Sequence, residues 1–295
     1  MNGINALIEW FGFDTAGGKY FTVFGIKITF YALCLLSGGL IALYLSNYRA
    51  HKKGMPMDVF STVFLWAFPG GVVGARIWYV IATWPGANGE YANDFLAVFR
   101  TWEGGLAIQG GAIGGALVGL LVVIFRRKGW DLFEAADCAG PTILIGQVIG
   151  RWGNFVNQEV YGQIVDVSAW GGLPSFINQR MMIGGSYRVP LFFLEAMINL
   201  GGYFFLTRFV PLVFSRHYRK GDQMFLYFSW YGFVRVLLEP LRDKQFNMGA
   251  ETTGNIKDMQ AVIMGIIFIV AGVLAVVANH LVRDIKEKKA GVKSL

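Results

Sequence analysis

Cysteine and charge are both scarce in this sequence, and each shortage excludes a class of protein. The two cysteines, Cys34 and Cys138, lie in or beside apolar segments and lack the spacing of metal ligands, so neither a disulfide framework nor a zinc site is indicated. They indicate no redox role either. The N-terminus lacks a basic region followed by an apolar run and a small-residue cleavage site, so we expect no cleaved signal peptide.

Apolar residues, in contrast, are abundant. The chain of 295 residues is 55% hydrophobic, 16% aromatic and only 15% charged, and its mean hydropathy is +0.47. That is more apolar surface than the core of a soluble protein of this size holds, so the composition predicts a polytopic membrane protein. The 39 glycines suit closely packed transmembrane helices.

Seven apolar stretches are long enough to cross a bilayer as helices. The predicted fold class is therefore all-α, with residues 1–295 forming a single transmembrane domain. We expect the aromatic-rich residues 1–25 to lie at the membrane interface and residues 159–188 to form a small extracytoplasmic head. The predicted spans are residues 28–45, 61–82, 105–125, 139–156, 189–209, 224–241 and 261–281.

The distribution of lysine and arginine predicts the orientation. Seven spans place the two termini on opposite sides of the membrane. The set of loops that includes the C-terminal tail holds fourteen of the twenty-six basic residues, and the set that includes the N-terminus holds eight. We therefore expect a cytoplasmic C-terminus and an N-terminus outside. The net charge of +7 then reflects attraction to anionic lipid and does not imply nucleic-acid binding.

The stretch from Gly150 to Gly162 places charged and amide side chains at the end of an apolar run. A charge within a bilayer costs about 2.5–3.5 kcal/mol and usually faces a bundle interior, where it serves a function. Arg151 and Asn154 lie three residues apart and share one face of a helix, which predicts a site for an anionic head group. Alternatively, Arg151 only snorkels from a helix end, but the amides of Asn154 and Asn157 on the same side favour the site.

Polar residues in six of the predicted spans agree in depth. All fall in the outer half of the membrane although their helices alternate in direction, which favours convergence on one cavity over scattered structural roles. They are Tyr31, Arg76, Gln109, Arg151, Glu195, Arg235 and Glu239.

The sixth span carries a polar stripe, because Tyr231, Arg235 and Glu239 follow one another at intervals of four residues. Two interpretations stay open. Arg235 and Glu239 form a self-contained ion pair, or Glu239 orients Arg235 so that its planar guanidinium binds two phosphate oxygens. Residues 102–111 form a glycine-rich loop that runs into a helix; helix packing explains glycines there but does not explain Gln109.

Three motifs resemble the signatures of bacterial phosphatidylglycerol–prolipoprotein diacylglyceryl transferases. They are the stretch 151–159 with Gly162, the stretch 102–111, and the stretch 231–239 with Arg242. The arginine–asparagine motif is highly specific, and the resemblance extends over nearly the whole chain. It implies an enzyme of the bacterial cell membrane that moves the diacylglyceryl group of phosphatidylglycerol onto the lipobox cysteine of a prolipoprotein signal peptide. The implied reaction releases glycerol 1-phosphate and needs no metal or cofactor.

The resemblance also implies which residues act. The implied catalytic residues are Arg151, Arg235, Tyr231 and Tyr31, and the implied phosphatidylglycerol-binding residues are Arg151, Asn154, Gln109, Gly110, Glu239, Arg76 and Gly162. Chemistry supports such a set, because neighbouring cations favour the thiolate form of a cysteine and preorganised arginines stabilise charge on a leaving phosphate. We assign Arg151 and Arg235 to the phosphate.

Two positions depart from the family pattern. The family often has histidine where this chain has Gln109, and often histidine–proline where this chain has Val189-Pro190. The first departure leaves open a degenerate relative that binds lipid or signal peptide without catalysis. A transporter with an anion site is a further alternative, but it predicts inverted repeats and interrupted helices, and no repeat is evident.

Overall fold

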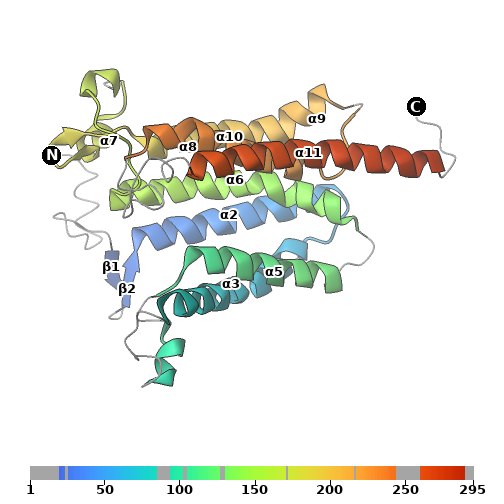
Figure 1. Ribbon diagram of the computed structural model, residues 1–295, viewed down its shortest axis with the longest axis horizontal. Helices are drawn as coiled ribbons and strands as arrows, with labels where there is room; N and C mark the ends of the chain where they lie inside the picture. The colour runs from blue at the N-terminus through green and yellow to red at the C-terminus, as the bar shows by residue number, and fades with distance from the viewer. Residues whose placement is uncertain are drawn as a thin grey trace. The chain divides into compact units, whose positions relative to one another are not determined.

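Helices dominate the computed structural model (Figure 1), which describes residues 20–23, 26–84, 94–101, 105–126, 130–170, 172–215, 217–243 and 260–289. The long helices are α2 (Phe30–Lys52), α3 (Val59–Thr83), α5 (Ile108–Arg126), α6 (Leu132–Asn157), α8 (Leu191–Phe204), α10 (Asp222–Leu238) and α11 (Gln260–Lys289). The π-helical η5 (Phe205–Phe209) and α9 (Val210–Val213) continue α8, and the 3-10 helix η6 (Glu239–Leu241) continues α10.

The remaining elements are short. They are the antiparallel pair β1 (Tyr20–Val23) and β2 (Ile26–Thr29), the 3-10 helices η2 (Phe95–Phe99) and η4 (Val167–Trp170), helix α7 (Ser175–Arg180), and the antiparallel pair β3 (Met182–Ile183) and β4 (Ser186–Tyr187). The interfacial segment predicted for residues 1–25 lies largely outside the described residues.

Each predicted span coincides with a helix, so the prediction of an all-α polytopic membrane protein is confirmed. Within the described ranges, five helices are long and apolar enough to cross a membrane, namely α2, α3, α6, α8 with its continuation, and α11; the apolar stretch in α5 is shorter. The count of seven spans stays a prediction. α6 begins at Leu132, ahead of the predicted residue 139, because the amphipathic stretch before the span belongs to the same helix.

The chain divides into two compact units. One comprises residues 1–42 and 136–295, and the other comprises residues 43–135. The single transmembrane domain expected from the sequence stays a prediction.

Helices α3 and α5 build the second unit and meet along glycines. A Cβ atom added to Gly114 would lie 2.9 Å from the Cα of Gly74, and one added to Gly74 or to Gly110 would collide with the carbonyl oxygen of the other. The two backbones therefore touch directly, as small residues allow between transmembrane helices.

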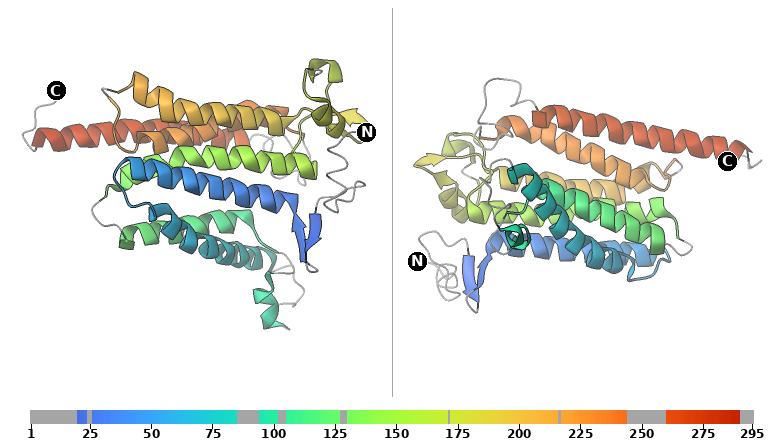
Figure 2. Two further views of the ribbon diagram at one scale, coloured as in Figure 1. Left: turned by 180° about the vertical axis from the view of Figure 1, so that it is seen from behind. Right: turned by 60° about the horizontal axis from the view of Figure 1, so that its bottom comes forward.

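Helix α6 lies between α2 and the pair α8 and α10 in the first unit (Figures 1 and 2). Gly146 packs against Gly38 of α2. On the other side, Gln147 donates a hydrogen bond to the Tyr227 hydroxyl of α10 at 3.3 Å and accepts one from Asn199 of α8 at 3.3 Å. These polar side chains within apolar helices satisfy one another, which fixes how the three helices face each other.

The start of α10 is held by Asp137, a fully buried residue of α6. Its carboxylate accepts hydrogen bonds from the Tyr218 hydroxyl at 2.7 Å and from the backbone amides of Gly221 and Met224 at 2.8 and 3.0 Å. A carboxylate at a helix N-terminus satisfies amides that have no partner within the helix. The same ends of α6 and α10 therefore lie together, and the two helices run parallel.

The segment 159–188, the predicted head, is a compact structure beyond the ends of α6 and α10. Its core comprises Ile177, Met181 and Tyr187, packed on Phe155 of α6 and Phe192 of α8. Arg180 of α7 donates to the backbone carbonyls of Phe155 and Val156, so a cation sits at the C-terminal end of α6, where the helix dipole favours it. The extracytoplasmic location of this head stays a prediction.

Candidate functional site

Arg151 is the centre of a hydrogen-bonded group formed by α6 and α8. Its Nη2 atom donates to Glu195 Oε1 at 2.6 Å, and its Nη1 atom donates to Asn154 Oδ1 at 3.2 Å. The side chains of Arg151 and Glu195 are only 16% and 10% exposed, so the arginine does not reach out of the protein as a snorkelling residue does. The predicted shared face of Arg151 and Asn154 is confirmed.

A strained turn after α6 extends this group toward the head. Asn154 Nδ2 donates to Glu159 Oε1 at 3.0 Å, and Asn157 donates to the same oxygen at 3.4 Å. On either side of Glu159, Gln158 and Val160 adopt positive φ angles of 51° and 55°. Such angles cost residues other than glycine on the order of 1–3 kcal/mol each and are retained where function requires a special geometry.

The polar stripe predicted on α10 is present. Arg235 Nε donates to the Tyr231 hydroxyl at 3.2 Å, and the guanidinium carbon lies 5.3 Å from the centre of the Tyr231 ring. Glu239, whose side chain is only 4% exposed, forms ion pairs with Arg235 at 3.7 Å and with Arg242 at 3.5 Å. One carboxylate thus lies between two arginines, which excludes an isolated pair of Arg235 and Glu239.

Arg242 joins the two groups into one electrostatic cluster. Burial lowers the pKa of Arg242, Glu239 and Glu195 raise it, and the positive charges of Arg235 and Arg151 lower it further. The guanidinium stays charged, because an arginine pKa remains far above neutrality. Its Nε atom is buried and has no hydrogen-bond partner among the described residues, so an added anion would satisfy both its charge and its donor.

The position of Arg242 beside Glu239 depends on the close packing of Gly162. The backbone of Gly162 pairs with that of Arg242, and a Cβ atom at Gly162 would lie 2.5 Å from the Cβ of Val189 and 2.7 Å from the carbonyl oxygen of Leu241. Only glycine fits between these two segments. Gly162 thereby sets the position of Arg242, and its predicted part in lipid binding stays a prediction.

Tyr31 lies at the start of α2, beside the arginine-bearing turn of α6. A Cβ atom added to Gly153 would lie 2.9 Å from the Tyr31 ring and 3.3 Å from Cys34, so glycine at 153 lets Tyr31 pack directly on α6. This places Tyr31 next to the chain neighbours of Arg151, and its catalytic role stays a prediction.

The second unit holds Arg76, Gln109 and Gly110. Arg76 donates to three backbone carbonyls, those of Ala97, Val98 and Gly105, at 2.6, 2.8 and 3.0 Å, and thereby ties η2 and the start of the glycine-rich segment to α3. Gln109 is an exposed residue in the first turn of α5, and Gly110 lies in the close contact with α3. The predicted lipid-binding roles of these three residues stay predictions.

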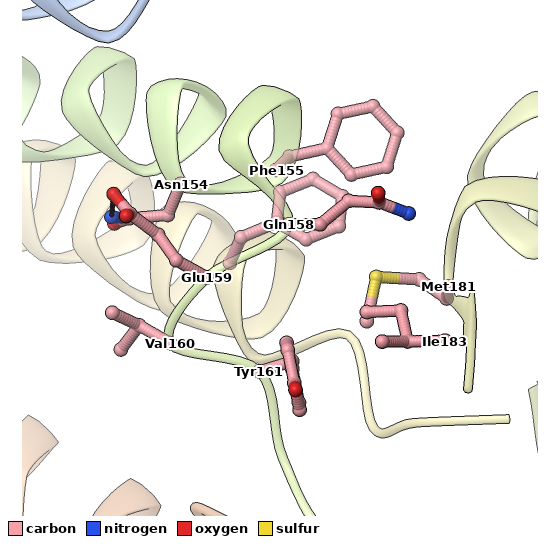
Figure 3. Close-up of a pocket in the computed structure, with 9 residues that line it drawn as sticks. Asn154, Phe155, Gln158, Glu159, Val160, Tyr161, Met181 and Ile183 are labelled. Carbon is pink, nitrogen blue, oxygen red and sulfur yellow. Dashed lines mark hydrogen bonds between the residues drawn. The ribbon is translucent and has the colours of Figure 1, made fainter. Parts of the chain in front are cut away.

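A small cavity opens where the strained turn meets the head (Figure 3). Asn154 and Glu159 lie together on one side of it, joined by their hydrogen bond, and Met181 and Ile183 approach from the other side. The cavity therefore has a polar edge shared with the Arg151 group and mostly apolar walls. Within the described part of the chain, no group of three histidine, cysteine or acidic residues could hold a metal ion.

Sequence patterns assign no role at the site to two residues of this cluster. Arg242 is the end of a motif, and Glu195 is one of the polar residues that agree in depth. The spacing of Arg242 three residues after Glu239 was a usable signal, but no pattern in the sequence joins Glu195 to Arg151, which is 44 residues away.

The fold and the cluster together define a class: a helical membrane protein in which partly buried arginines and carboxylates form one cluster. The family model of prolipoprotein diacylglyceryl transferases matches residues 19–278. Proteins from Streptococcus pyogenes serotypes M5 (strain Manfredo), M49 (strain NZ131) and M1, each named phosphatidylglycerol–prolipoprotein diacylglyceryl transferase, are 39% identical over 250 residues, which cover 83% of this chain and 91% of each relative. The chain belongs to the prolipoprotein diacylglyceryl transferase family.

Proposed function

We propose that the cluster of Arg151, Arg235 and Arg242 is the site at which this chain carries out the reaction for which its family is named. The chain transfers the diacylglyceryl group of phosphatidylglycerol to a prolipoprotein, as the names of its relatives state for them. The acceptor atom is the sulfur of the lipobox cysteine in the signal peptide. The donor is drawn from the surrounding bilayer.

The reaction is a substitution at carbon. The cysteine thiol loses its proton, and the thiolate sulfur forms a bond to the terminal glyceryl carbon of the diacylglyceryl group. The bond between that carbon and the phosphate oxygen breaks, and its electron pair leaves with the oxygen as glycerol 1-phosphate. The proton leaves with this product or enters solvent. No oxidation state changes, so the step needs no redox cofactor.

The arginines act on the phosphate. Negative charge accumulates on the leaving phosphate as the bond to carbon breaks, and preorganised cations shielded from water stabilise it most. The observation that carries the proposal is Arg242, whose buried Nε has no hydrogen-bond partner among the described residues and whose guanidinium shares the field of Arg235 and Arg151. A guanidinium also binds two phosphate oxygens at once.

The carboxylates and the tyrosine orient these cations. Glu195 holds Arg151, and Glu239 lies between Arg235 and Arg242, so each arginine keeps its position before lipid binds. The Tyr231 hydroxyl, which accepts the hydrogen bond from Arg235, keeps its own proton to donate to the leaving oxygen or the attacking sulfur. Cations near the thiol also lower its pKa.

The cluster lies at the end of the first unit that carries the head, and this supports the predicted topology. The prolipoprotein cysteine then meets lipid at the outer face of the bacterial cell membrane, with the N-terminus of this chain outside and its C-terminus in the cytoplasm. The excess of basic residues in the opposite loops is the basis for that orientation.

The test uses purified protein with labelled phosphatidylglycerol and a lipobox peptide. We expect label on the peptide, none on a peptide with serine in place of the cysteine, and a loss of about tenfold or more in kcat/KM for Arg242→Lys, which keeps charge but loses the planar fork. No transfer by the native protein would overturn the proposal.

A further inference from the structure

A further ion pair joins the head to the residue that directly follows Arg242. Arg188, which follows β4, pairs with Asp243, which follows Arg242. Both side chains are only 18% exposed. The Arg188 guanidinium carbon also lies 5.3 Å from the centre of the Tyr161 ring, so the arginine is fixed from two directions.

Backbone hydrogen bonds join the same three segments. The segment 161–165 lies in the middle. On one side, Gly162 donates to the Val189 carbonyl at 2.9 Å, and Val189 donates to the Gln163 carbonyl at 3.0 Å. On the other side, Gln163 donates to the Leu241 carbonyl at 2.9 Å, and Asp243 donates to the Tyr161 carbonyl at 3.2 Å. The ion pair of Arg188 and Asp243 therefore joins the two outer segments across segment 161–165, which lies between them.

The extended backbone at Arg242 connects this arrangement to the phosphate site. Arg242 has φ −71° and ψ 146°, and successive side chains of an extended segment point to opposite faces. Arg242 therefore faces Glu239 while Asp243 faces Arg188. Glu239 holds the end of the Arg242 side chain at 3.5 Å, and the backbone on either side of Arg242 sets the point from which that side chain extends.

We propose that Arg188 and Asp243 are positioning residues for the phosphate site, which set the place of Arg242 through the backbone of residues 241–243. The inference rests on the proposed function, because it takes Arg242 as a ligand of the lipid phosphate. Loss of Asp243 takes the ion-pair partner from a partly buried arginine, and loss of Arg188 takes one cation from Asp243. In either case the segment that carries Arg242 loses a contact that fixes its place.

A charge exchange tests the pairing. We expect Arg188→Asp and Asp243→Arg each to lower kcat/KM for phosphatidylglycerol by about tenfold, at a temperature where the variants are folded. The double variant restores the attraction but not the contact with the Tyr161 ring, so we expect it to recover most of that loss. Arg188→Lys keeps the charge and folds more readily, and its kcat/KM should lie between those of the native protein and Arg188→Asp.

Asp284→Arg is the matched control, because Asp284 pairs with Arg219 at the other end of α10. It should change the melting temperature without changing kcat/KM. Native kinetics in both single variants, or no recovery in a double variant that melts like the native protein, would overturn the inference.

Binding of short-chain phosphatidylglycerol, measured on the same samples, separates this inference from the proposed function. One outcome is that the native protein binds lipid, the single variants at 188 and 243 bind it more weakly, and the native protein transfers nothing. The positioning role then stands and the transferase proposal fails. If transfer occurs and lipid affinity ignores both residues, the positioning role fails alone.

Discussion

The three arginines of the cluster are not equivalent, because their own hydrogen bonds differ. Arg151 donates to Glu195 and Asn154, and Arg235 donates to Tyr231. Arg242 has a carboxylate at 3.5 Å and a buried Nε without a partner in the described part of the chain. The first two thus have donors committed to holding the site together, whereas Arg242 is the most available to a ligand.

Lysine substitutions distinguish charge from geometry at the two committed arginines. Arg151→Lys and Arg235→Lys keep the positive charge but lose the planar fork, so we expect kcat/KM to fall about tenfold, or about 1.4 kcal/mol of transition-state stabilisation. Circular dichroism and the melting temperature should stay close to those of the native protein. Full activity in both variants would remove the two guanidinium groups from the mechanism.

Gln109 gives a second prediction at the scale of one residue. Glutamine does not titrate. A plot of the native transfer rate against pH should therefore show no change in slope near the histidine reference pKa of about 6.5. Arginine charge lowers the thiol pKa by itself, and a neutral hydrogen-bonding side chain suffices at 109.

We therefore expect Gln109→His to retain activity and Gln109→Ala to lose more than Gln109→His. Transfer that is absent in the native protein and appears only with histidine at 109 would instead identify a degenerate relative.

The contact between the head and the end of α10 depends on Gly162. We expect Gly162→Ala to lower activity at least about tenfold, because its methyl group would push Val189 and the Leu241 carbonyl apart and move Arg242. Gly172→Ala in the same head is the control, since a Cβ atom there meets nothing within 4 Å. Equal activity of the two variants in the transfer assay would show that this contact does not set the site.

The sequence predicted the helices and the α10 stripe because both leave local patterns. Apolar runs mark the spans, and intervals of four residues bring Tyr231, Arg235 and Glu239 to one face. The contact between the head and the end of α10 leaves no such pattern: Gln163 donates to the Pro240 carbonyl 77 residues away, and backbone acceptors have no residue signature. For the same reason, the sequence does not predict the three carbonyl partners of Arg76, and the role in lipid binding that the family resemblance implies for Arg76 stays a prediction.

Across the first unit as a whole, helix directions alternate. Arg151, late in α6, meets Glu195, early in α8, so these two helices are antiparallel. The start of α10 meets the late part of α11, since His280 Nε2 lies 2.9 Å from Asp222 Oδ2. Polar residues from helices of opposite direction therefore share one end of the unit, as their depths in the sequence predicted, and the membrane orientation of that end is open to test.

Labelling from outside the cell tests that orientation. The head and the late part of α11 lie at opposite ends of the first unit, because α10 begins beside Asp284 and ends beside Gly162. We expect a cysteine at Ser168, which is exposed in the head, to react with an impermeant thiol reagent in intact cells, and one at Lys288 to react only after lysis. Both variants carry serine in place of Cys34 and Cys138, so that no native thiol contributes. Labelling of Lys288→Cys in intact cells would invert the topology and place the arginine cluster at the cytoplasmic face, where no exported cysteine reaches it.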